Sequence, residues 1–267
     1  MRHSLHITNR CNLRCFYCYE DDKDTSSFIP YVATVPEALQ RAENMIVHGA
    51  HSIEIIGGEP LLYPDIVQKV LETFSTRCSF CITTNGMINN EQIEHILMRF
   101  SPTVHVSVDD PVTTHRFRRG SDLNRILQHA HTWSMLTDVT IHNVLHPHNF
   151  QHMQESFVFY VRHHGFKTLG FGVVEEWMSP FYWKKYIEGG KEVIDMMTEK
   201  EMRSVHISPW AEYAPFDKEI IYSHGGKVEL EEIFHPVDTD DSPYGLSKRE
   251  LAGYYKERRN ALLHTGG

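Results

Sequence analysis

The sequence lacks the features that would place the chain in a membrane. Its 267 residues contain no run of about 18 apolar residues, the length that a membrane-spanning helix requires. The first residues, Met1 to Ile7, enter a strand-like alternation at once and offer no targeting segment. With 41% hydrophobic and 23% charged residues, the composition is typical of a soluble globular chain. We therefore expect a cytoplasmic protein without a membrane partner.

Positive charge is scarce and scattered. The formal net charge is −9, and no block of lysine and arginine is longer than three or four residues. Binding to DNA or RNA needs a concentrated basic surface that neutralises phosphates. The tightest basic cluster, Arg116, Arg118 and Arg119, suits one anionic ligand better than a duplex. We therefore expect no nucleic-acid partner.

Cysteine is sparse, and all of it lies in the first third of the chain. There are five cysteines, and none follows Cys81; an odd number without a signal peptide argues against a disulfide framework. Cys11, Cys15 and Cys18 have the spacing C-x3-C-x2-C. Three thiolates this close in sequence can bind three corners of one iron–sulfur cube, which leaves the fourth iron open to a small molecule. Three ligands make the alternative, a closed four-coordinate zinc site, awkward.

Strand-like and helix-like segments alternate through about the first 175 residues. Six strands are predicted, at Leu5–Ile7, Ser52–Ile56, Phe80–Thr83, Val104–Val108, Val139–Val144 and Lys167–Val174. Helical segments separate them, including one that we expect to begin at a Ser121 cap, and this alternation is typical of parallel βαβ units. The pattern predicts an α/β protein, either a partial barrel or an open doubly wound sheet. In both folds, ligands bind at the carboxyl ends of the strands.

Distinctive motifs follow the predicted strand ends. The three cysteines follow the first strand, Gly57-Gly58-Glu59-Pro60 follows the second, and Thr84-Asn85-Gly86 follows the third. Two successive glycines allow a ligand to approach the backbone closely, although an ordinary βα turn also uses them. Asn-Gly is likewise a common turn. Their shared placement predicts one binding site at this edge of the sheet.

Together these motifs resemble the radical S-adenosylmethionine (radical SAM) superfamily. Cys11, Cys15 and Cys18 match its cluster motif one for one. The resemblance implies a partial (β/α)6 barrel, one [4Fe-4S] cluster, and S-adenosylmethionine bound to the open iron. In this family the reduced cluster cleaves S-adenosylmethionine to a 5′-deoxyadenosyl radical, which abstracts hydrogen from a substrate. The resemblance also implies a reductant such as flavodoxin or ferredoxin.

The same resemblance implies several contacts with S-adenosylmethionine. Gly57, Gly58 and Glu59 resemble the family's GGEP motif, which hydrogen-bonds the amino group of the cofactor. Asn85 resembles a turn residue near its adenosine and methionine parts. Tyr17 matches a position that touches adenine.

The segment from Ser107 to Arg119 is similar to one in the sulfatase-maturase and peptide-maturase branch. There, a serine and an arginine contact S-adenosylmethionine, which assigns Ser107 and Arg119, with Arg118 as a rival for the arginine role. A guanidinium suits the task because it binds a carboxylate through two parallel hydrogen bonds. Val174 would lie under the adenine ring, with simple core packing as the alternative. We carry over no further catalytic residue.

Cys78 and Cys81 form a second C-x2-C. Side chains alternate along a strand, so these two would point to opposite faces. Cys81 is predicted to be a core residue, with a second metal site as the alternative. The peptide-maturase branch usually carries a cysteine-rich C-terminal domain with auxiliary clusters, and this chain departs from that pattern. We therefore predict a single cluster.

The pattern changes after about residue 175. A long helix is predicted from Trp177 to Met197, a hairpin at about residues 220–230, and a terminal helix from Ser247 to Leu263. We predict a radical SAM partial-barrel core over residues 1–176. Residues 177–267 form a small C-terminal extension, which we expect to cover the substrate side.

The sequence therefore predicts a radical SAM enzyme, with the substrate left open. The maturase-like segment favours a ribosomally made peptide, modified by crosslinking, epimerisation or dehydrogenation. The absence of auxiliary clusters suits a small-molecule enzyme that acts on a sugar, nucleoside or amino acid in natural-product biosynthesis. A glycyl-radical-enzyme activase is a further alternative. A non-catalytic iron–sulfur protein is the contrasting hypothesis, because fold alone does not prove function.

Overall fold

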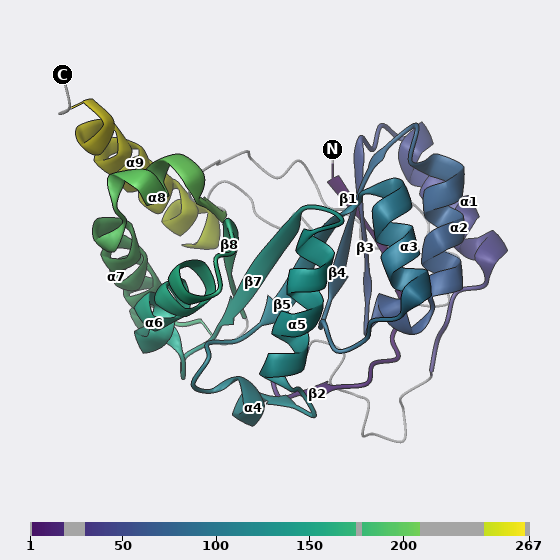
Figure 1. Ribbon diagram of the computed structural model, residues 1–267, viewed down its shortest axis with the longest axis horizontal. Helices are drawn as coiled ribbons and strands as arrows, with labels where there is room; N and C mark the ends of the chain where they lie inside the picture. The colour runs from purple at the N-terminus through teal and green to yellow at the C-terminus, as the bar shows by residue number, and fades with distance from the viewer. Residues whose placement is uncertain (1, 19–29, 175–177, 209–242, 265–267) are drawn as a thin grey trace. The chain divides into compact units, whose positions relative to one another are not determined.

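The chain forms two compact units in a computed structural model that describes residues 2–18, 30–174, 178–208 and 243–264 (Figure 1). In this part of the chain, the first unit comprises the residues up to Val106 together with His115–Val139. The second unit comprises Ser107–Thr114 and the described residues from Thr140 onward. The division predicted after residue 176 stays a prediction.

Parallel strands form the centre of the first unit. They are hydrogen-bonded in the order β1 (Arg2–Thr8), β3 (Ser52–Gly57), β4 (Ser79–Thr84) and β5 (Thr103–Val108). Each corresponds to one of the predicted strands. Because parallel neighbours need a crossover connection, a helix follows each strand.

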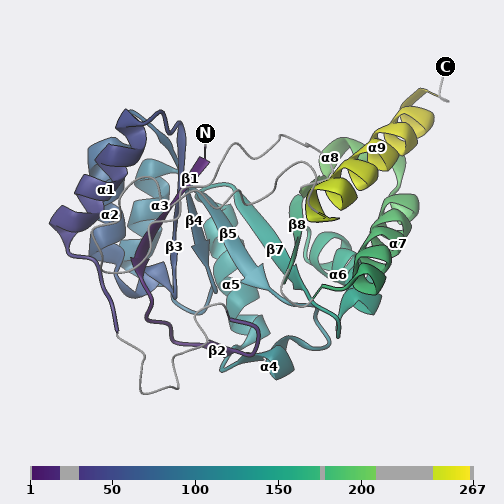
Figure 2. The ribbon, with the colours of Figure 1, turned by 180° about the vertical axis from the view of Figure 1, so that it is seen from behind.

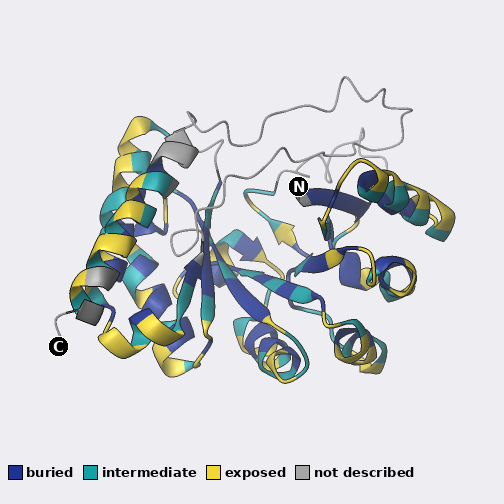
Figure 3. Cartoon of the chain, turned by 90° about the horizontal axis from the view of Figure 1, so that it is seen from above, coloured by how far each residue is buried: buried dark blue, intermediate teal, exposed yellow. Residues whose placement is uncertain are grey.

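Helices cover one face of these strands. They are α1 (Val35–Val47), α2 (Pro64–Phe74), α3 (Glu91–Phe100) and α5 (Leu123–Ser134). Figure 2 shows α1, α2 and α3 together beside β1, β3 and β4. Facing them is an apolar strand surface, with side chains 0–6% exposed, from Ile53, Ile55, Phe80, Ile82, Val104 and Val106. Burial of each large side chain stabilises the fold by about 1.5–3 kcal/mol. Figure 3 shows largely buried strands and, beside them, helices that are buried on one side and exposed on the other.

The opposite surface of the same strands, which we call the polar face, carries Glu54, Cys81 and His105. Glu54 lies directly beside Cys81 in the parallel register. Cys81 lies beside Thr103, and His105 follows Thr103 by two residues, so it shares the same side of the strands. Strand alternation thus separates an apolar face from a polar one.

Side-chain caps begin several of these helices, and one of the caps differs from the sequence prediction. Thr34 and Glu37 form a capping box at the start of α1, and Asn90 caps α3. The prediction of Ser121 as the cap of α5 was wrong, because Asp122 accepts a hydrogen bond from the Arg125 amide at 3.2 Å. The Ser121 hydroxyl is buried without a hydrogen-bond partner in the described structure. Serine and aspartate are equally good caps, so composition alone did not separate adjacent candidates.

The second unit continues the alternation of strands and helices. Parallel strands β7 (Val139–Leu145), β8 (Thr168–Val173) and β9 (His206–Ser208) are hydrogen-bonded in that order. The first two were predicted. β9 was not, because three residues are too few for a strand pattern. α6 (Met153–Phe157) runs into a π-helical turn at Val158–His163 before β8.

Helices α7 (Pro180–Met196), α8 (Glu199–Ser204) and α9 (Pro243–His264) follow in the same unit. α7 packs against α9 (Figure 2). Both long helices were predicted, with somewhat different starts, whereas the predicted hairpin lies outside the described residues. Within the described ranges, no helix combines the length and apolar character that a bilayer span needs.

An ion pair fastens the start of α8 to the π-helical turn. The Arg162 guanidinium donates to both carboxylate oxygens of Glu201, at 2.7 and 3.1 Å, and also to the Met196 carbonyl at 2.7 Å. Glu201 also accepts from the Thr198 amide at 2.7 Å in a capping box. The hydrogen bonds from Arg162 lower the pKa of Glu201 from 4.5 to about 2. This pair therefore stabilises the folded unit while Glu201 is ionised.

Two glycines on β8 make room for a histidine on β7. His142 lies beside Gly170 in the strand register, and Val144 lies beside Gly172. A Cβ atom added at Gly172 would lie 2.2 Å from Nε2 of His142, and one at Gly170 would lie 3.6 Å from Nδ1. The imidazole therefore lies over strand backbone that carries no side chains.

Candidate functional site

The loop that carries the three cysteines, residues 9–18, is anchored at its start. The Thr8 hydroxyl donates to the Tyr31 carbonyl at 2.8 Å and accepts from the Arg10 amide at 3.0 Å. The Asn9 side chain accepts from the Tyr31 amide at 2.7 Å. We call residues 9–18 the cluster loop. These hydrogen bonds fix the path of the cluster loop directly after the end of β1.

A short antiparallel ribbon, absent from the sequence prediction, holds the second half of the cluster loop. β2 (Arg14–Cys15) pairs with β6 (Arg118–Arg119). Beyond it, the Phe16 amide donates to the Phe117 carbonyl at 2.8 Å. The Cys18 amide turns back to the Cys15 carbonyl at 3.2 Å. Backbone pairing thus positions the last two cysteines.

The cysteine environment suits ligation of an iron–sulfur cluster. All three cysteines are half-buried. The sulfur of Cys11 accepts from the Leu13 amide at 3.3 Å and from the Asn85 side-chain amide at 3.5 Å. N–H groups directed at sulfur favour its anionic, ligating form and help to set a cluster's potential. Asn85 also donates to Asn12 at 2.8 Å, so the predicted turn residue contacts the cluster loop directly.

Gly57 and Gly58 allow two loops to pack backbone against backbone. A Cβ atom at Gly57 would lie 2.1 Å from the Thr8 carbonyl oxygen, and one at Gly58 would lie 2.3 Å from that of Arg10. Across this contact the Gly58 amide donates to Thr8, and the Glu59 amide donates to Arg10, both at 2.8 Å. The sequence predicted close approach by a ligand. The structure adds the cluster loop as a neighbour that itself requires glycine.

Glu59 joins the ends of β3 and β4. Its side chain is fully buried. One carboxylate oxygen accepts from the Leu61 amide at 2.9 Å and the Thr84 hydroxyl at 2.8 Å, and the other accepts from the Asn85 amide at 2.7 Å. Burial raises the pKa of Glu59, and these hydrogen bonds oppose the rise. The carboxylate therefore holds together the two loops that carry the predicted cofactor residues.

The two candidate arginines occupy different environments. Arg118 is 4% exposed. Its guanidinium donates to the Tyr17 hydroxyl at 2.9 Å. Burial raises the pKa of Glu59, and the charge of Arg118 opposes that rise. Arg119 is exposed, and its backbone pairs with Arg14. The structure therefore brings Arg118 into contact with one predicted site residue, Tyr17, and it leaves the Arg119 side chain at the surface.

Ser107 and Val174 belong to the second unit. Ser107 is half-buried near the end of β5. Val174 is 9% exposed, and its amide donates to the Leu145 carbonyl at 2.9 Å. Both therefore lie at carboxyl ends of strands, where ligands gather in parallel α/β folds.

Sequence reasoning missed a buried polar network in the second unit. Nε2 of His146 lies 3.7 Å from Oδ2 of Asp109, and both side chains are fully buried. The Tyr160 hydroxyl donates to the Asp109 carbonyl at 2.5 Å, and the His146 amide donates to Asn149 at 2.8 Å. The signal was present in Asp109, which follows β5, and in His146, which follows β7. This network supports the segment that begins at Ser107.

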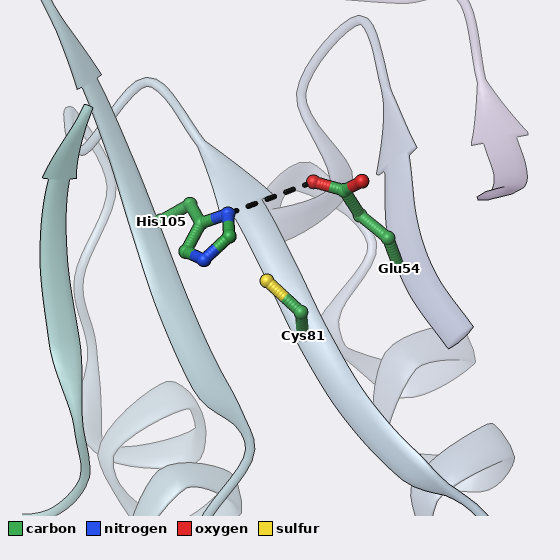
Figure 4. Close-up of side chains that lie close together, drawn as sticks. All are labelled: Glu54, Cys81 and His105. Atoms are coloured by element: carbon green, nitrogen blue, oxygen red, sulfur yellow. Dashed lines mark ion pairs between the residues drawn. The ribbon is translucent and has the colours of Figure 1, made fainter. Parts of the chain in front are cut away.

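Sequence reasoning also missed a cluster on the polar face of the first unit. Figure 4 shows Glu54, Cys81 and His105 pointing toward one another from three adjacent strands. Nδ1 of His105 lies 3.7 Å from Oε1 of Glu54. Burial lowers the pKa of His105, but the neighbouring Cys81 and Glu54 raise it to about 9 overall. Cys81 is buried as predicted, with polar partners in place of an apolar core.

A comparison with family profiles identifies much of the first unit and part of the second. The profile of the radical SAM superfamily matches residues 5–159. This range includes all three cluster-loop cysteines, both glycines and both candidate arginines.

Among curated proteins, the chain is similar to a GTP 3′,8-cyclase from Limosilactobacillus fermentum. The two are 32% identical over 138 residues, which is 49% of this chain and 41% of that protein. A 7-carboxy-7-deazaguanine synthase from Methanothermobacter thermautotrophicus is 37% identical over 108 residues, or 39% of this chain and 40% of that protein. The chain thus spans about two fifths of the length of the curated relatives it matches.

Among solved structures, the chain is similar to anSMEcpe with bound AdoMet. The TM-score is 0.63 at 19% identity, over 78% of this chain and 64% of that one. Streptococcus suis SuiB bound to precursor peptide SuiA gives a TM-score of 0.56 at 15% identity, over 76% of this chain and 43% of that one. At this identity the likeness concerns the fold, and it confirms the predicted partial α/β barrel.

Proposed function

Because this chain belongs to the radical SAM superfamily and is therefore an enzyme that uses a [4Fe-4S] cluster and S-adenosylmethionine, we propose that it modifies a ribosomally made peptide. The observation that carries this proposal is the segment from Ser107 to Arg119, which ends in the ribbon that holds Cys15. The same stretch of chain thus supplies both maturase-like residues and part of the cluster loop's support.

Cys11, Cys15 and Cys18 would hold the cluster in this proposal. When bound, the cluster and S-adenosylmethionine supply a carbon-centred radical that abstracts hydrogen from the substrate. The residues of the chain bind and orient these groups. Asn85 and the Leu13 amide direct N–H groups at the Cys11 sulfur.

The other residues predicted to contact S-adenosylmethionine have different roles in this proposal. Tyr17, Gly57, Gly58 and Asn85 of the first unit would line the S-adenosylmethionine site. Ser107 and Val174 keep the cofactor roles that the sequence resemblance assigns to them. Glu59 acts by holding the loops around that site, because its carboxylate oxygens already accept hydrogen bonds from Leu61, Thr84 and Asn85. For the carboxylate of S-adenosylmethionine we propose Arg118 ahead of Arg119, since Arg118 is the buried guanidinium next to Tyr17.

Fold likeness supports a peptide substrate. The SuiB structure carries a precursor peptide, and anSMEcpe has been solved with AdoMet and the Cp18Cys peptide at a TM-score of 0.60. We propose crosslinking, epimerisation or dehydrogenation as the outcome. A reductant such as flavodoxin or ferredoxin would supply the electron.

A small-molecule substrate is the second candidate, and sequence similarity favours it. The curated relatives at 32% and 37% identity are a GTP 3′,8-cyclase and a 7-carboxy-7-deazaguanine synthase. The polar face, with Glu54 and His105 side chains only 14% and 19% exposed, would suit a compact polar ligand.

The test is substrate-stimulated release of 5′-deoxyadenosine. The full chain is reconstituted anaerobically with iron and sulfide, reduced, and incubated with S-adenosylmethionine and either the peptide or the metabolite fraction of a host extract. Cys15→Ala is the inactive control. Cys78→Ser is the matched cysteine control, because Cys78 is buried and donates to the Ala50 carbonyl at 3.8 Å.

We expect the peptide fraction to stimulate release at least about tenfold, as a substrate that orders the site should do. Cys15→Ala should give only background, while Cys78→Ser should behave like the wild type. Stimulation by metabolites alone would replace the peptide proposal with the small-molecule one. Equal activity of Cys15→Ala and the wild type would overturn the cluster assignment itself.

The arginine assignment is tested in the same assay. Arg118→Lys should raise the KM for S-adenosylmethionine roughly 10- to 100-fold, because lysine cannot make two parallel hydrogen bonds to a carboxylate. Arg119→Lys should change it less than about threefold. A reversed result would restore Arg119 as the contact.

A further inference from the structure

We propose that Glu54, Cys81 and His105 form a second metal site, which binds one Zn²⁺ ion on the polar face of the first unit. One donor atom from each residue lies within 4.8 Å of the other two. Among the described residues, this is the one group of three such side chains that meets so closely. The inference does not depend on the substrate proposed above.

The backbone explains why these three side chains converge. Parallel strands run about 4.8 Å apart, and the register places Glu54 of β3 directly beside Cys81 of β4. His105 of β5 pairs with Thr83, two residues beyond Cys81. Residues two apart on a strand share a face, so the long imidazole reaches back toward the thiol. Rigid hydrogen-bonded strands thus carry all three ligands.

The spacing fits a tetrahedral ion. Zinc bonds of about 2.0–2.3 Å to oxygen, nitrogen and sulfur place the donor atoms of one site roughly 3.3–3.8 Å apart. A nitrogen and an oxygen ligand would lie about 3.4 Å apart, and the 3.7 Å from Nδ1 of His105 to Oε1 of Glu54 is within a few tenths of an ångström of that separation. Three protein ligands would leave a fourth position for water or a substrate group, as in catalytic zinc sites.

The donor set selects zinc over the common hard cations. Mg²⁺ and Ca²⁺ prefer oxygen ligands throughout, whereas a thiolate and an imidazole suit Zn²⁺. Cys81 is 6% exposed, and the Glu54 and His105 side chains are 14% and 19% exposed. The site is therefore shielded, yet an ion could still enter from the polar face.

Thr83 supplies a supporting contact of the kind that metal sites use. Its hydroxyl donates to the same Glu54 oxygen that lies nearest His105. Hydrogen bonds to a ligating carboxylate fix its orientation, and their loss typically lowers metal affinity 10- to 100-fold. Thr83 is accordingly a positioning residue for Glu54.

The proposed ion would be distinct from the iron–sulfur cluster. Glu54 precedes Gly57 by three residues and Cys81 precedes Asn85 by four. At about 3.3 Å per residue, the zinc ligands lie roughly 10 Å back along the strands from the cofactor loops. An ion there would lie beneath the proposed S-adenosylmethionine site, where its open position could bind an anionic or thiol group of a substrate.

Metal analysis of the full chain tests the proposal. Because zinc could also bind the cluster-loop thiols when no cluster is present, we compare two preparations. One is the reconstituted holoenzyme, and the other is the full chain carrying Cys11→Ala, Cys15→Ala and Cys18→Ala. Each is exposed to ZnCl₂, desalted, and analysed for iron and zinc; Co²⁺ is then substituted to record thiolate-to-cobalt absorption.

We expect about one zinc per chain in both preparations, together with a cobalt–thiolate band. Adding Cys81→Ser should abolish the band and reduce zinc at least tenfold, whereas Cys78→Ser should preserve both. Thr83→Val should keep the band but weaken zinc affinity roughly 10- to 100-fold. Failure of the wild type to retain zinc, or retention unchanged by Cys81→Ser, would overturn the proposal.

A second variant covers the case in which Cys81→Ser does not fold. His105→Gln keeps a polar side chain of similar reach, and circular dichroism first establishes that it folds. Added ZnCl₂ should raise the melting temperature of the triple-alanine chain but not of the same chain carrying His105→Gln, because only a folded site binds the ion. Equal stabilisation of both chains would contradict the assignment.

Discussion

Two glutamates of the first unit show how position decides the use of the same side chain. Glu59 lies beyond the end of β3 with its carboxylate fully buried, and it accepts hydrogen bonds from Leu61, Thr84 and Asn85. Glu54 lies within β3, is 14% exposed, and has Thr83 and His105 as neighbours. The carboxylate of Glu59 is committed to the protein's own loops, whereas that of Glu54 faces side chains that can also bind an ion.

The difference separates two kinds of polar burial. A buried carboxylate that accepts hydrogen bonds from buried donors stabilises the folded state strongly. Without it, each donor left unpaired would cost about 1–3 kcal/mol. A partly exposed group can exchange its partners for water at little cost. The loops at the strand ends are therefore held in one arrangement, while the side chains of the polar face can still bind another partner.

The largest expected effect contrasts these two glutamates directly. Glu59→Ala should lower the free energy of unfolding by about 3–5 kcal/mol, because three buried donors lose their acceptor. Glu54→Ala should cost less, about 1–2 kcal/mol in metal-free protein, because its carboxylate is partly exposed and has fewer buried donors to leave unpaired. Urea unfolding measures both. Similar losses of unfolding free energy for the two variants would contradict the difference proposed between Glu59 and Glu54.

A third glutamate, in the second unit, should give an intermediate and pH-dependent effect. Because ionised Glu201 is held by Arg162 with a pKa of about 2, its contribution is present above its ordinary pKa of 4.5 and is lost as the pH falls toward 2. Glu201→Gln should therefore cost roughly 1–2 kcal/mol at pH 7, after allowance for solvent screening.

At about pH 2, wild type and Glu201→Gln should have converged in stability. Unfolding curves measured between pH 7 and pH 2 check this. Glu188→Gln is a suitable control, because Glu188 pairs with Lys184 and Lys185 at the surface and should change stability by less than about 0.5 kcal/mol. A pH-independent loss for Glu201→Gln would show that shape, and not charge, is responsible.

The smallest expected effect contrasts two adjacent polar residues at the start of α5. Asp122→Ala should cost about 1 kcal/mol, because the Arg125 amide loses its cap. Ser121→Ala should be neutral to slightly stabilising, since it removes a buried hydroxyl that has no hydrogen-bond partner in the described structure. Thermal unfolding distinguishes them, and a larger loss for Ser121→Ala would return the cap to that residue.

Much of the fold could be predicted because it depends on local pattern. The six predicted strands and the capped helices α1 and α3 carry alternation, β-branched residues and caps that act within a few residues. β2, β6 and β9 could not be predicted, because each is two or three residues long and is defined by its partner strand.

The candidate site likewise has a part that could be predicted from the sequence and a part that could not. The cysteine spacing is local, so residues 9–18 could be predicted as the cluster-binding segment from the sequence alone. The exposure of Arg119 and the burial of Arg118 depend on the ribbon with Arg14 and Cys15, which the sequence did not reveal. The cluster at Glu54, Cys81 and His105 draws one residue from each of three strands, and no short motif records such a meeting.

The bare backbone of β8 has a consequence for how this sequence can vary. A Cβ atom at position 172 would lie 2.2 Å from the His142 imidazole. The residues at 142 and 172, which are 30 positions apart in the sequence, therefore cannot both carry side chains that occupy this space. Evolutionary drift at either should be coupled to the other. In descendants of this protein, a side chain at 172 should appear only after position 142 has become small.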